Sequence, residues 1–255
     1  MGLKLSEAKA DPSRVRLSVE DHIGLIEMVD AEGRNGFSEG LVRALLWALA
    51  EVEANREIVV AVLAGLPEIF SSGATPGVLE AIREGNYPAT ELVLGRHLID
   101  LRVPVIAAAE GHAIGGGFAL LLSCDLSVLA KESRYGANFM SLGITPGMGT
   151  TRLLEEIVGK SLAHELLYTG ELRRGSTLVG AGFSAVVERA EVRDRAHRLA
   201  WSIAEKPRSS VELLKRTLSL PRRRAFEEAR TLESLMHERS FRDLDLEALG
   251  QGVSK

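Results

Sequence analysis

Three consecutive glycines, Gly115 to Gly117, stand between a β-branched run and an apolar segment near the middle of the chain. The run Val103 to Ala108 is typical of a strand, the segment after the glycines is typical of a helix, and a second strand is expected after Asp125. Glycine lets the backbone come close to a ligand, and the first N–H groups of a helix have no intrahelical acceptor. This helix start suits an oxyanion or a phosphate; the alternative is that the glycines only let the helix pack against the strand.

A second glycine-rich loop follows an earlier apolar strand. Residues 58–64 form a continuous apolar run, typical of a strand buried on both faces, and the loop 65–77 leads to a short helix expected at 78–83. The loops that end at Gly73–Ala74 and at Gly115–Gly116 would meet if both strands end at one edge of a sheet. Two backbone N–H groups directed at one point form an oxyanion hole, which stabilises the negative oxygen that develops in acyl chemistry.

Two nucleotide-binding motifs are excluded by their spacing. The central segment reads G-x-x-x-G-G-G, whereas a dinucleotide fingerprint requires G-x-G-x-x-G and an acidic residue at the end of the following strand. The triplet Gly159-Lys160-Ser161 resembles the end of a P-loop, but Leu154 occupies the position of the first glycine of that motif. These exclusions favour the oxyanion interpretation of the two loops.

The composition is that of an ordinary globular protein, because 45% of the 255 residues are apolar and 26% are charged. A net charge of −4 gives no electrostatic footprint for nucleic acid or an anionic membrane. The lone Cys124 excludes an internal disulfide, and with six scattered histidines it supplies no metal-ligand spacing. No apolar signal core or membrane-length apolar run is present. We expect a cytoplasmic protein with no metal, nucleic-acid or membrane partner.

Strands and helices alternate along the first two thirds of the chain, and the last third is almost wholly helical. Residues 14–29 alternate as in a hairpin, and Ser38 precedes an apolar helical spacing that ends near Asn55. This alternation predicts an α/β fold. Further helices are expected at 88–101, from Thr150, at 164–168, 176–181, 192–204, 208–219 and 223–241, with Pro221 between the last two, a strand at 185–187 and a frayed tail at 243–255.

These segments resemble, in order and spacing, the enoyl-CoA hydratase/isomerase (crotonase) superfamily over residues 10 to 245. The resemblance rests on FSSGA at 70–74, GHAIGGGFALLLSCDLSV at 111–128 and SLGITPGMGTTRL at 141–153. It implies a spiral core of ββα turns at 1–200, a C-terminal helical region at 201–255 that builds a trimer or hexamer, and an acyl-thioester substrate. It also implies that the N–H groups of Ala74 and Gly116 hold the thioester oxygen.

Two departures from the family pattern bear on the reaction. Hydratases of this family place one glutamate two residues after the glycine triplet and another four residues before the glycine of the SLGITPG turn; this chain has Ala119 and Phe139 there. Adding water across a double bond needs groups that activate water and donate a proton, which a methyl and a phenyl ring cannot do. Hydration is therefore disfavoured, and Phe139 and Phe118 are expected to make the pocket less polar.

Other motifs resemble the crotonase-type decarboxylases of polyketide β-branching cassettes, which convert 3-methylglutaconyl units on an acyl carrier protein to 3-methylcrotonyl units. They are ANFM at 137–140, TPGMG at 145–149, EKPRSSVELLK at 205–215 and MHERSF at 236–241. The resemblance makes His237 the candidate for protonating the dienolate or holding the carboxylate. It implies no cofactor beyond the phosphopantetheine arm, which belongs to a carrier protein or to coenzyme A.

The group that binds the substrate carboxylate is open. Some relatives place a tyrosine and a lysine in the helix after the first oxyanion loop, where this chain has Val78 and Ile82. Substitutes for that role are Arg83, Thr75 and Asn138. A decarboxylation needs no enzymic carboxylate, because the thioester carbonyl held by two N–H donors accepts the electron pair.

Several of these residues have a plainer interpretation. His237 could be a surface or interface histidine, His112 could line the pocket or bond backbone groups of its loop, and Asn138 could cap a turn. The basic run Arg222 to Arg224 is either a solvated helix start or a docking patch for an acidic carrier protein. Two other functions also stay open: a thioester double-bond isomerase, and a catalytically silent protein that binds acyl thioesters.

Overall fold

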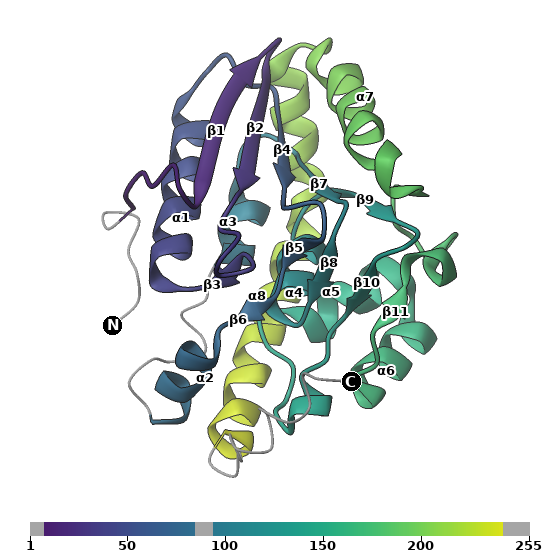
Figure 1. The fold of residues 1–255 in the computed structure, drawn as a ribbon. Helices are drawn as coiled ribbons and strands as arrows, with labels where there is room; N and C mark the ends of the chain where they lie inside the picture. The colour runs from purple at the N-terminus through teal and green to yellow at the C-terminus, as the bar shows by residue number, and fades with distance from the viewer. Residues whose placement is uncertain (1–7, 85–93, 242–255) are drawn as a thin grey trace.

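The computed structural model describes residues 8–84 and 94–241 of the chain (Figure 1). The strands are β1 Val15–Glu20, β2 Ile23–Met28, β3 Gly36–Phe37, β4 Val60–Ala64, β5 Ile69–Ser71, β6 Gly73–Ala74, β7 Val105–Ala109, β8 His112–Ile114, β9 Leu126–Ala130, β10 Arg134–Gly136, β11 Arg173–Arg174 and β12 Ala185–Val187. The α-helices are α1 Glu39–Ala54, α2 Pro76–Arg83, α3 Leu94–Asp100, α4 Gly116–Leu122, α5 Thr150–Val158, α6 Lys160–Thr169, α7 Val192–Ala204 and α8 Arg208–Ser240. The chain therefore has the predicted α/β class.

The larger sheet has six strands in the order β1-β2-β4-β7-β9-β12, of which only β1 pairs antiparallel with its neighbour. Its central strands alternate between two apolar layers. Val60, Val62 and Ala64 of β4 face α7, whereas Ala61 and Leu63 join the core on the side of α1 and α4. Burial on both faces explains why these strands read as continuous apolar runs.

A second sheet has four strands in the order β11-β10-β8-β5. Each of β4, β7 and β9 is followed within five residues by a short strand of this sheet, namely β5, β8 and β10. The chain thus repeats a long strand and a short strand before each connection, and the three short strands are parallel neighbours. Because parallel strands end at one edge, the segments that leave β5, β8 and β10 are brought together.

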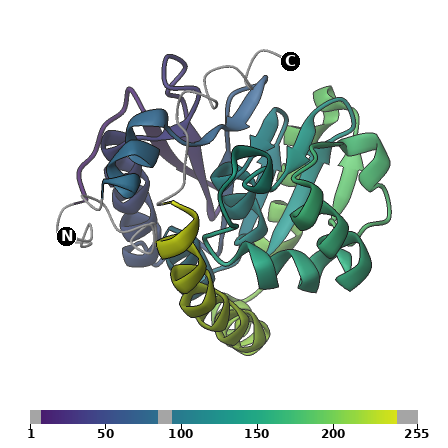
Figure 2. The same ribbon diagram turned by 90° about the horizontal axis from the view of Figure 1, so that it is seen from below.

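Helix α8 corrects one prediction. We expected two helices separated by Pro221, but a single helix of 33 residues passes through that proline. It runs along the molecule behind the sheets, between α3 and α5 (Figures 1 and 2). Lys215 and Arg222 anchor it on both sides of Pro221: Lys215 is bonded to Asp125, and Arg222 donates to the carbonyl of Cys124. These contacts and the buried Phe226 offset the cost of about 3 kcal/mol that proline imposes inside a helix.

Smaller differences also come from tertiary pairing. The predicted loop 65–77 contains β5 and β6, because β6 pairs in parallel with β3. The predicted helix 176–181 is only a 3-10 turn at Gly175–Leu178. Of the helix expected at 88–101, residues 88–93 lie outside the described residues, as does the tail 243–255. The hairpin, α1 with its Ser38 cap, β12 and α7 are confirmed. No helix in the described part of the chain is long and apolar enough to cross a membrane.

Candidate active site

The two predicted glycine loops meet where β5 and β8 end. A Cβ placed on Gly73 would lie only 2.8 Å from the backbone nitrogen of Gly116 and 2.8 Å from the carbonyl oxygen of Ile114. Gly73 also has a φ of +79°, which residues with a side chain rarely adopt. Both the close approach and the backbone conformation therefore require glycine at this position. The amides of Ala74 and Gly116 thus belong to two backbone segments in direct contact.

Each glycine of the triplet has its own steric reason. Gly115 has a φ of +54° and lies against the side chain of Asn138, which follows β10. A Cβ on Gly116 would lie 3.0 Å from the ring of Phe37 and 3.2 Å from the sulfur of Met148, and a Cβ on Gly117 would collide with the carbonyl of the β5 residue Ser71. Among the described residues, the first α4 amide with a backbone acceptor is that of Ala119. The triplet therefore packs the helix closely and also leaves its start free for a ligand.

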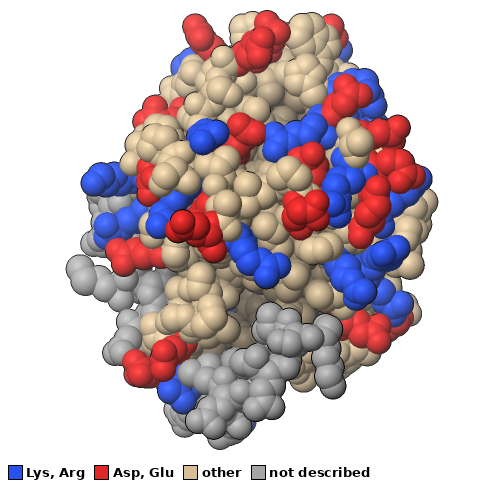
Figure 3. All heavy atoms as spheres, viewed as in Figure 1, with Lys and Arg blue, Asp and Glu red and all other residues tan. Residues whose placement is uncertain are grey.

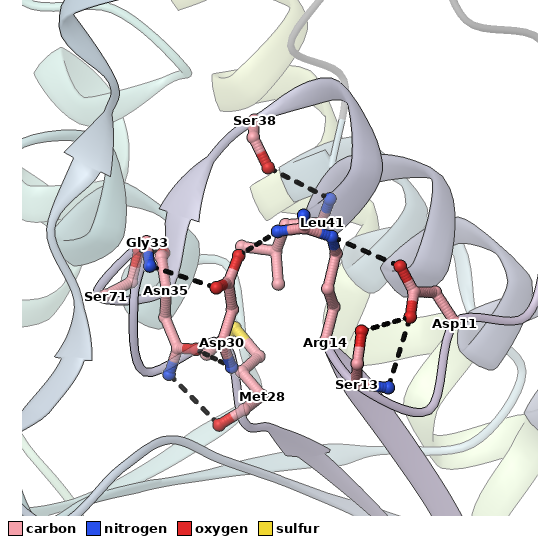
Figure 4. A network of polar contacts seen from close by, with 10 residues as sticks. All are labelled: Asp11, Ser13, Arg14, Met28, Asp30, Gly33, Asn35, Ser38, Leu41 and Ser71. Atoms are coloured by element: carbon pink, nitrogen blue, oxygen red, sulfur yellow. Dashed lines mark hydrogen bonds and ion pairs between the residues drawn. The ribbon is translucent and has the colours of Figure 1, made fainter.

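A buried polar network holds the first of these loops (Figure 4). The side chain of Asn35, which is fully buried, donates to the carbonyls of Met28 (3.0 Å) and Phe70 (3.1 Å). The hydroxyl of Ser71 donates to the carbonyl of Asn35 (2.7 Å) and accepts a hydrogen bond from the amide of Gly73 (3.2 Å). Asn35 and Ser71 therefore fix the backbone immediately before Ala74.

The same network continues to the surface of the molecule. The amide of Asp30 donates to the side-chain oxygen of Asn35 (2.9 Å), and the Asp30 carboxylate accepts from the amide of Gly33 and pairs with Arg14. The sequence alone does not identify Asn35 and Ser71 as residues that support the site. The dipeptide Asn35-Gly36 marks a turn, but nothing local shows that the Asn35 side chain reaches a strand 35 residues away.

An apolar cluster lies beside the loop that follows β10. It joins α2, the turn after β10 and the end of α8, and its members are Leu79, Ile82, Phe139, Leu142, Ile144 and Phe241. Phe139 also packs on the main core, so it connects the cluster to that core. Ala119, the other position where hydratases carry a glutamate, is fully buried. Neither position offers an ionisable group.

His237 lies on α8, behind the turn 145–149. Its Nε2 is 2.9 Å from the carbonyl oxygen of Thr145. Because a carbonyl oxygen only accepts, Nε2 carries a proton and donates a hydrogen bond to it. A Cβ on Gly147 would be 2.5 Å from the imidazole, and the ring of Phe241 packs edge-on against it at 5.2 Å. Burial lowers the pKa of His237, although its bond to Thr145 opposes this. The structure thus places the imidazole against the turn, and its role toward a substrate stays a prediction.

The side chains of Phe118 and His112 are engaged within the fold. Phe118 is 1% exposed and packs in the core, with its ring 6.5 Å from that of Phe183, so it offers no surface to a substrate. The Nδ1 of His112 accepts a hydrogen bond from the amide of Arg134 (2.8 Å) and thereby joins β8 to β10. Burial lowers the pKa of His112, and the nearby Arg189 adds to the effect. In this structure both side chains support the scaffold.

The three candidates for a carboxylate-binding group lie on different elements. Thr75 caps α2, with its hydroxyl accepting from the amide of Val78 (3.4 Å). Arg83 stands at the end of α2 and pairs with Glu80 at 3.8 Å. Asn138 is half-buried, with its oxygen beside Gly115. Asn138 is thus the candidate that the structure places beside the glycine triplet.

The basic run at 222–224 is not a uniform surface patch. Arg222 donates to the carbonyls of Leu122 (2.5 Å) and Cys124 (3.0 Å) at the end of α4, and Arg223 is paired with Asp100 at 2.6 Å. On the face seen in Figure 3, basic and acidic side chains are interspersed.

Within residues 8–84 and 94–241, no group of three histidine, cysteine or acidic side chains is arranged to hold a metal ion.

Comparison with known proteins agrees with this architecture. A family model described as enoyl-CoA hydratase/isomerase matches residues 18–254. The bacillaene synthase decarboxylase PksI of Bacillus subtilis is 37% identical over 238 residues, which cover 93% of this chain and 96% of that protein. The crystal structure of the ECH2 decarboxylase domain of CurF from Lyngbya majuscula is 35% identical, with a TM-score of 0.85 over 94% of this chain and 99% of that one.

A third similar structure comes from a dehydratase/decarboxylase enzyme couple involved in polyketide β-branching. It is 37% identical to this chain, with a TM-score of 0.89, and the match covers 94% of this chain and 98% of that one. All three matches therefore extend over nearly the whole length of both partners.

Proposed function

Because the chain belongs to the enoyl-CoA hydratase/isomerase (crotonase) family and has decarboxylases among its relatives, we propose that it decarboxylates a carrier-protein-bound thioester in polyketide β-branching. The substrate we propose is a 3-methylglutaconyl thioester and the product its 3-methylcrotonyl counterpart. The observation that carries the proposal is the pair Ala119 and Phe139. They leave a thioester-binding site without the two carboxylates of a hydratase, and decarboxylation needs neither.

The electron pair of the breaking C–C bond must be accepted by the thioester. As CO2 leaves, the electron pair moves through the conjugated system onto the carbonyl oxygen. The acyl thioester becomes a dienolate with its negative charge on that oxygen. In our proposal the amides of Ala74 and Gly116 donate hydrogen bonds to that oxygen. Loss of one such donor typically slows a reaction by about 10² to 10³. The close contact of Gly73 with Gly116 supports two donors that reach one oxygen.

The apolar cluster around Phe139 supports the same reaction. In it, Leu79 and Ile82 of α2 pack with Phe139, Ile144 and Phe241. Such surroundings disfavour a localised carboxylate charge more than the dispersed charge of the transition state. We propose that Asn138, Thr75 or Arg83 orients the carboxylate at the border of this cluster.

The dienolate must finally take up a proton at carbon. His237 is the proposed donor: its imidazolium form would give the proton and become neutral imidazole, after exchanging its bond to the Thr145 carbonyl for one to the substrate. A purely structural role also fits its position, because the same hydrogen bond holds the turn beside the site. The two roles differ in their effect on the chemical step, which makes His237 the informative residue for a test.

Intact-protein mass spectrometry of 3-methylglutaconyl carrier protein incubated with the chain tests the proposal. We expect the acyl carrier protein to lose the mass of CO2. The variants His237→Ala and His237→Gln separate the roles, because glutamine can keep the bond to Thr145 but cannot act as an acid. If His237 donates the proton, both variants are slow; if it only holds the turn, glutamine restores the rate.

Other outcomes identify the alternatives. A double-bond isomerase would leave the mass unchanged and move the double bond, which NMR of the released acyl group detects. A silent binding protein would retain the acyl carrier protein without altering it. An unchanged mass with the wild-type chain refutes the decarboxylase proposal.

A further inference from the structure

A buried carboxylate on α8 has no part in the proposed chemistry. Glu233 is 2% exposed, and its two oxygens accept three hydrogen bonds from the start of α5. One oxygen accepts from the amide of Gly149 (2.8 Å), and the other accepts from the amide (3.0 Å) and the hydroxyl (2.7 Å) of Thr151. All three partners are donors, which is the set of partners that an ionised carboxylate requires. Burial of an acid is costly, so this arrangement calls for a reason.

Helix α5 cannot supply its own N-terminal cap. The cap position is Gly149, whose φ is +81° and whose Cβ, if it had one, would collide with the ring of Phe226. Serine, threonine, aspartate and asparagine, the usual capping residues, are therefore excluded there. Glu233 provides the missing acceptor from another helix.

The turn that Glu233 holds also contacts the catalytic candidate Gly116. Met148, next to Gly149, has a φ of +60°, a conformation that costs a residue with a side chain about 1 kcal/mol or more. Its sulfur lies against Gly116, 3.2 Å from where a Cβ would stand. Without fixed neighbours the Met148 backbone would relax, and the support behind the Gly116 amide would move with it.

Two further side chains on the same face of α8 hold the beginning of this turn. His237 donates to the carbonyl of Thr145, and the Ser240 hydroxyl lies 3.3 Å from the Thr145 amide and 3.0 Å from its hydroxyl. Residues 233, 237 and 240 are spaced by four and three, so they project from one side of the helix. The turn 145–149 and the start of α5 that follows it are thus both held by α8.

We propose that Glu233 is a positioning residue: it caps α5 from α8 and thereby keeps Met148 against Gly116, so that the Gly116 amide stays aligned with the thioester oxygen. This inference rests on the proposed function, because it assigns Glu233 an effect on the same oxyanion hole. It requires that a change at Glu233 alter the chemical step, beyond any change in stability.

The test compares Glu233→Gln with Glu228→Gln. Glutamine has one acceptor oxygen, so its NH2 group would face the amide of Gly149 or Thr151, two groups that can only donate. Glu228 is the matched control, because it is also on α8 and accepts a hydrogen bond from Arg152 of α5 at 2.8 Å, but it is exposed and its partner lies beyond the turn. Thr151→Val is a milder second variant that removes only the hydroxyl donor.

The first measurement is kcat and KM for loss of CO2 from 3-methylglutaconyl carrier protein, below the melting temperature of every variant. A displacement of a fraction of an ångström in a catalytic group typically costs about tenfold or more. We expect kcat to fall about tenfold in Glu233→Gln with KM within about twofold, a smaller fall in Thr151→Val, and no change in Glu228→Gln. A purely structural residue would lower the melting temperature and leave kcat of the folded protein unchanged.

The second measurement needs no turnover. The infrared C=O stretch of 3-methylcrotonyl-pantetheine, 13C-labelled at its thioester carbonyl, falls in frequency when that carbonyl accepts hydrogen bonds in the site. We expect a shift with the wild-type chain and a smaller one with Glu233→Gln. If the wild type shifts the band and Glu233→Gln shifts it equally with unchanged kcat, the role of Glu233 is refuted while the oxyanion hole stands. No shift with the wild type refutes the oxyanion hole and, with it, the role of Glu233.

Discussion

Gly73→Ala is the substitution that tests the site geometry most directly. The added methyl would stand 2.8 Å from the Gly116 nitrogen and from the Ile114 oxygen, against an ordinary contact distance of about 3.5 Å. One of the two loops must therefore move by more than about half an ångström. The φ of +79° adds a backbone cost of roughly 1 to 2 kcal/mol for alanine.

These two effects predict different magnitudes in two assays. The backbone cost and the contact together should destabilise the fold by about 1 to 3 kcal/mol, which lowers the melting temperature of a chain of this size by about 2 to 10 °C. Displacing one of two oxyanion donors should slow loss of CO2 by about 10². We expect a folded protein that binds the acyl carrier protein and turns it over very slowly.

Gly77→Ala is the matched control. Gly77 lies in α2, four residues further along the chain, and a Cβ on it would meet nothing within 4 Å. Alanine there should keep the rate and raise stability by up to about 1 kcal/mol, because glycine weakens a helix. Circular dichroism melting and mass spectrometry of the acyl carrier protein measure both quantities. A Gly73→Ala rate within about threefold of wild type would refute the assignment of these loops to catalysis.

Three further predictions concern the framework around the site. Asn35→Asp replaces the donor that serves Met28 and Phe70 with a buried carboxylate oxygen, and we expect it to lower the free energy of unfolding in urea by about 3 kcal/mol or more. Lys215→Ala removes the buried ammonium that bonds both oxygens of the half-buried Asp125 at 2.7 Å, and we expect a loss of about 2 kcal/mol or more in the same assay. Burial raises the pKa of the Cys124 thiol to about 12, so a disulfide reagent at pH 8 should label it only as fast as the protein opens, and at once in guanidinium.

Controls for these predictions come from the same chain. Asn55→Asp keeps the acceptor that the Glu57 amide uses and should be nearly neutral. Lys131→Ala removes an exposed ion pair with Glu188 and should cost less than about 1 kcal/mol. Equal losses in the buried variants and their exposed controls would contradict the energetic reasoning, as would rapid labelling of Cys124 in the native protein.

Local sequence determined the elements whose signals are local. The Ser38 cap with its apolar spacing gave α1, the alternation of 14–29 gave the hairpin, and the glycine triplet marked the start of α4. The identities of Ala119 and Phe139 could also be interpreted directly, because the absence of a carboxylate at a position needs no coordinates.

Tertiary structure decided what depends on distant partners. Proline disfavours a helix interior because it lacks an N–H group and its ring clashes with the preceding turn. Helix α8 nevertheless continues through Pro221, because Lys215 and Arg222 are anchored to the segment at the end of α4. The same contacts turn Arg222 from a surface cation into a cap for α4. His237 and Glu233 look alike in sequence, as polar residues on a charged helix. Only the position of the turn 145–149 and the start of α5 against that helix makes Glu233 a buried cap and binds His237 to a carbonyl.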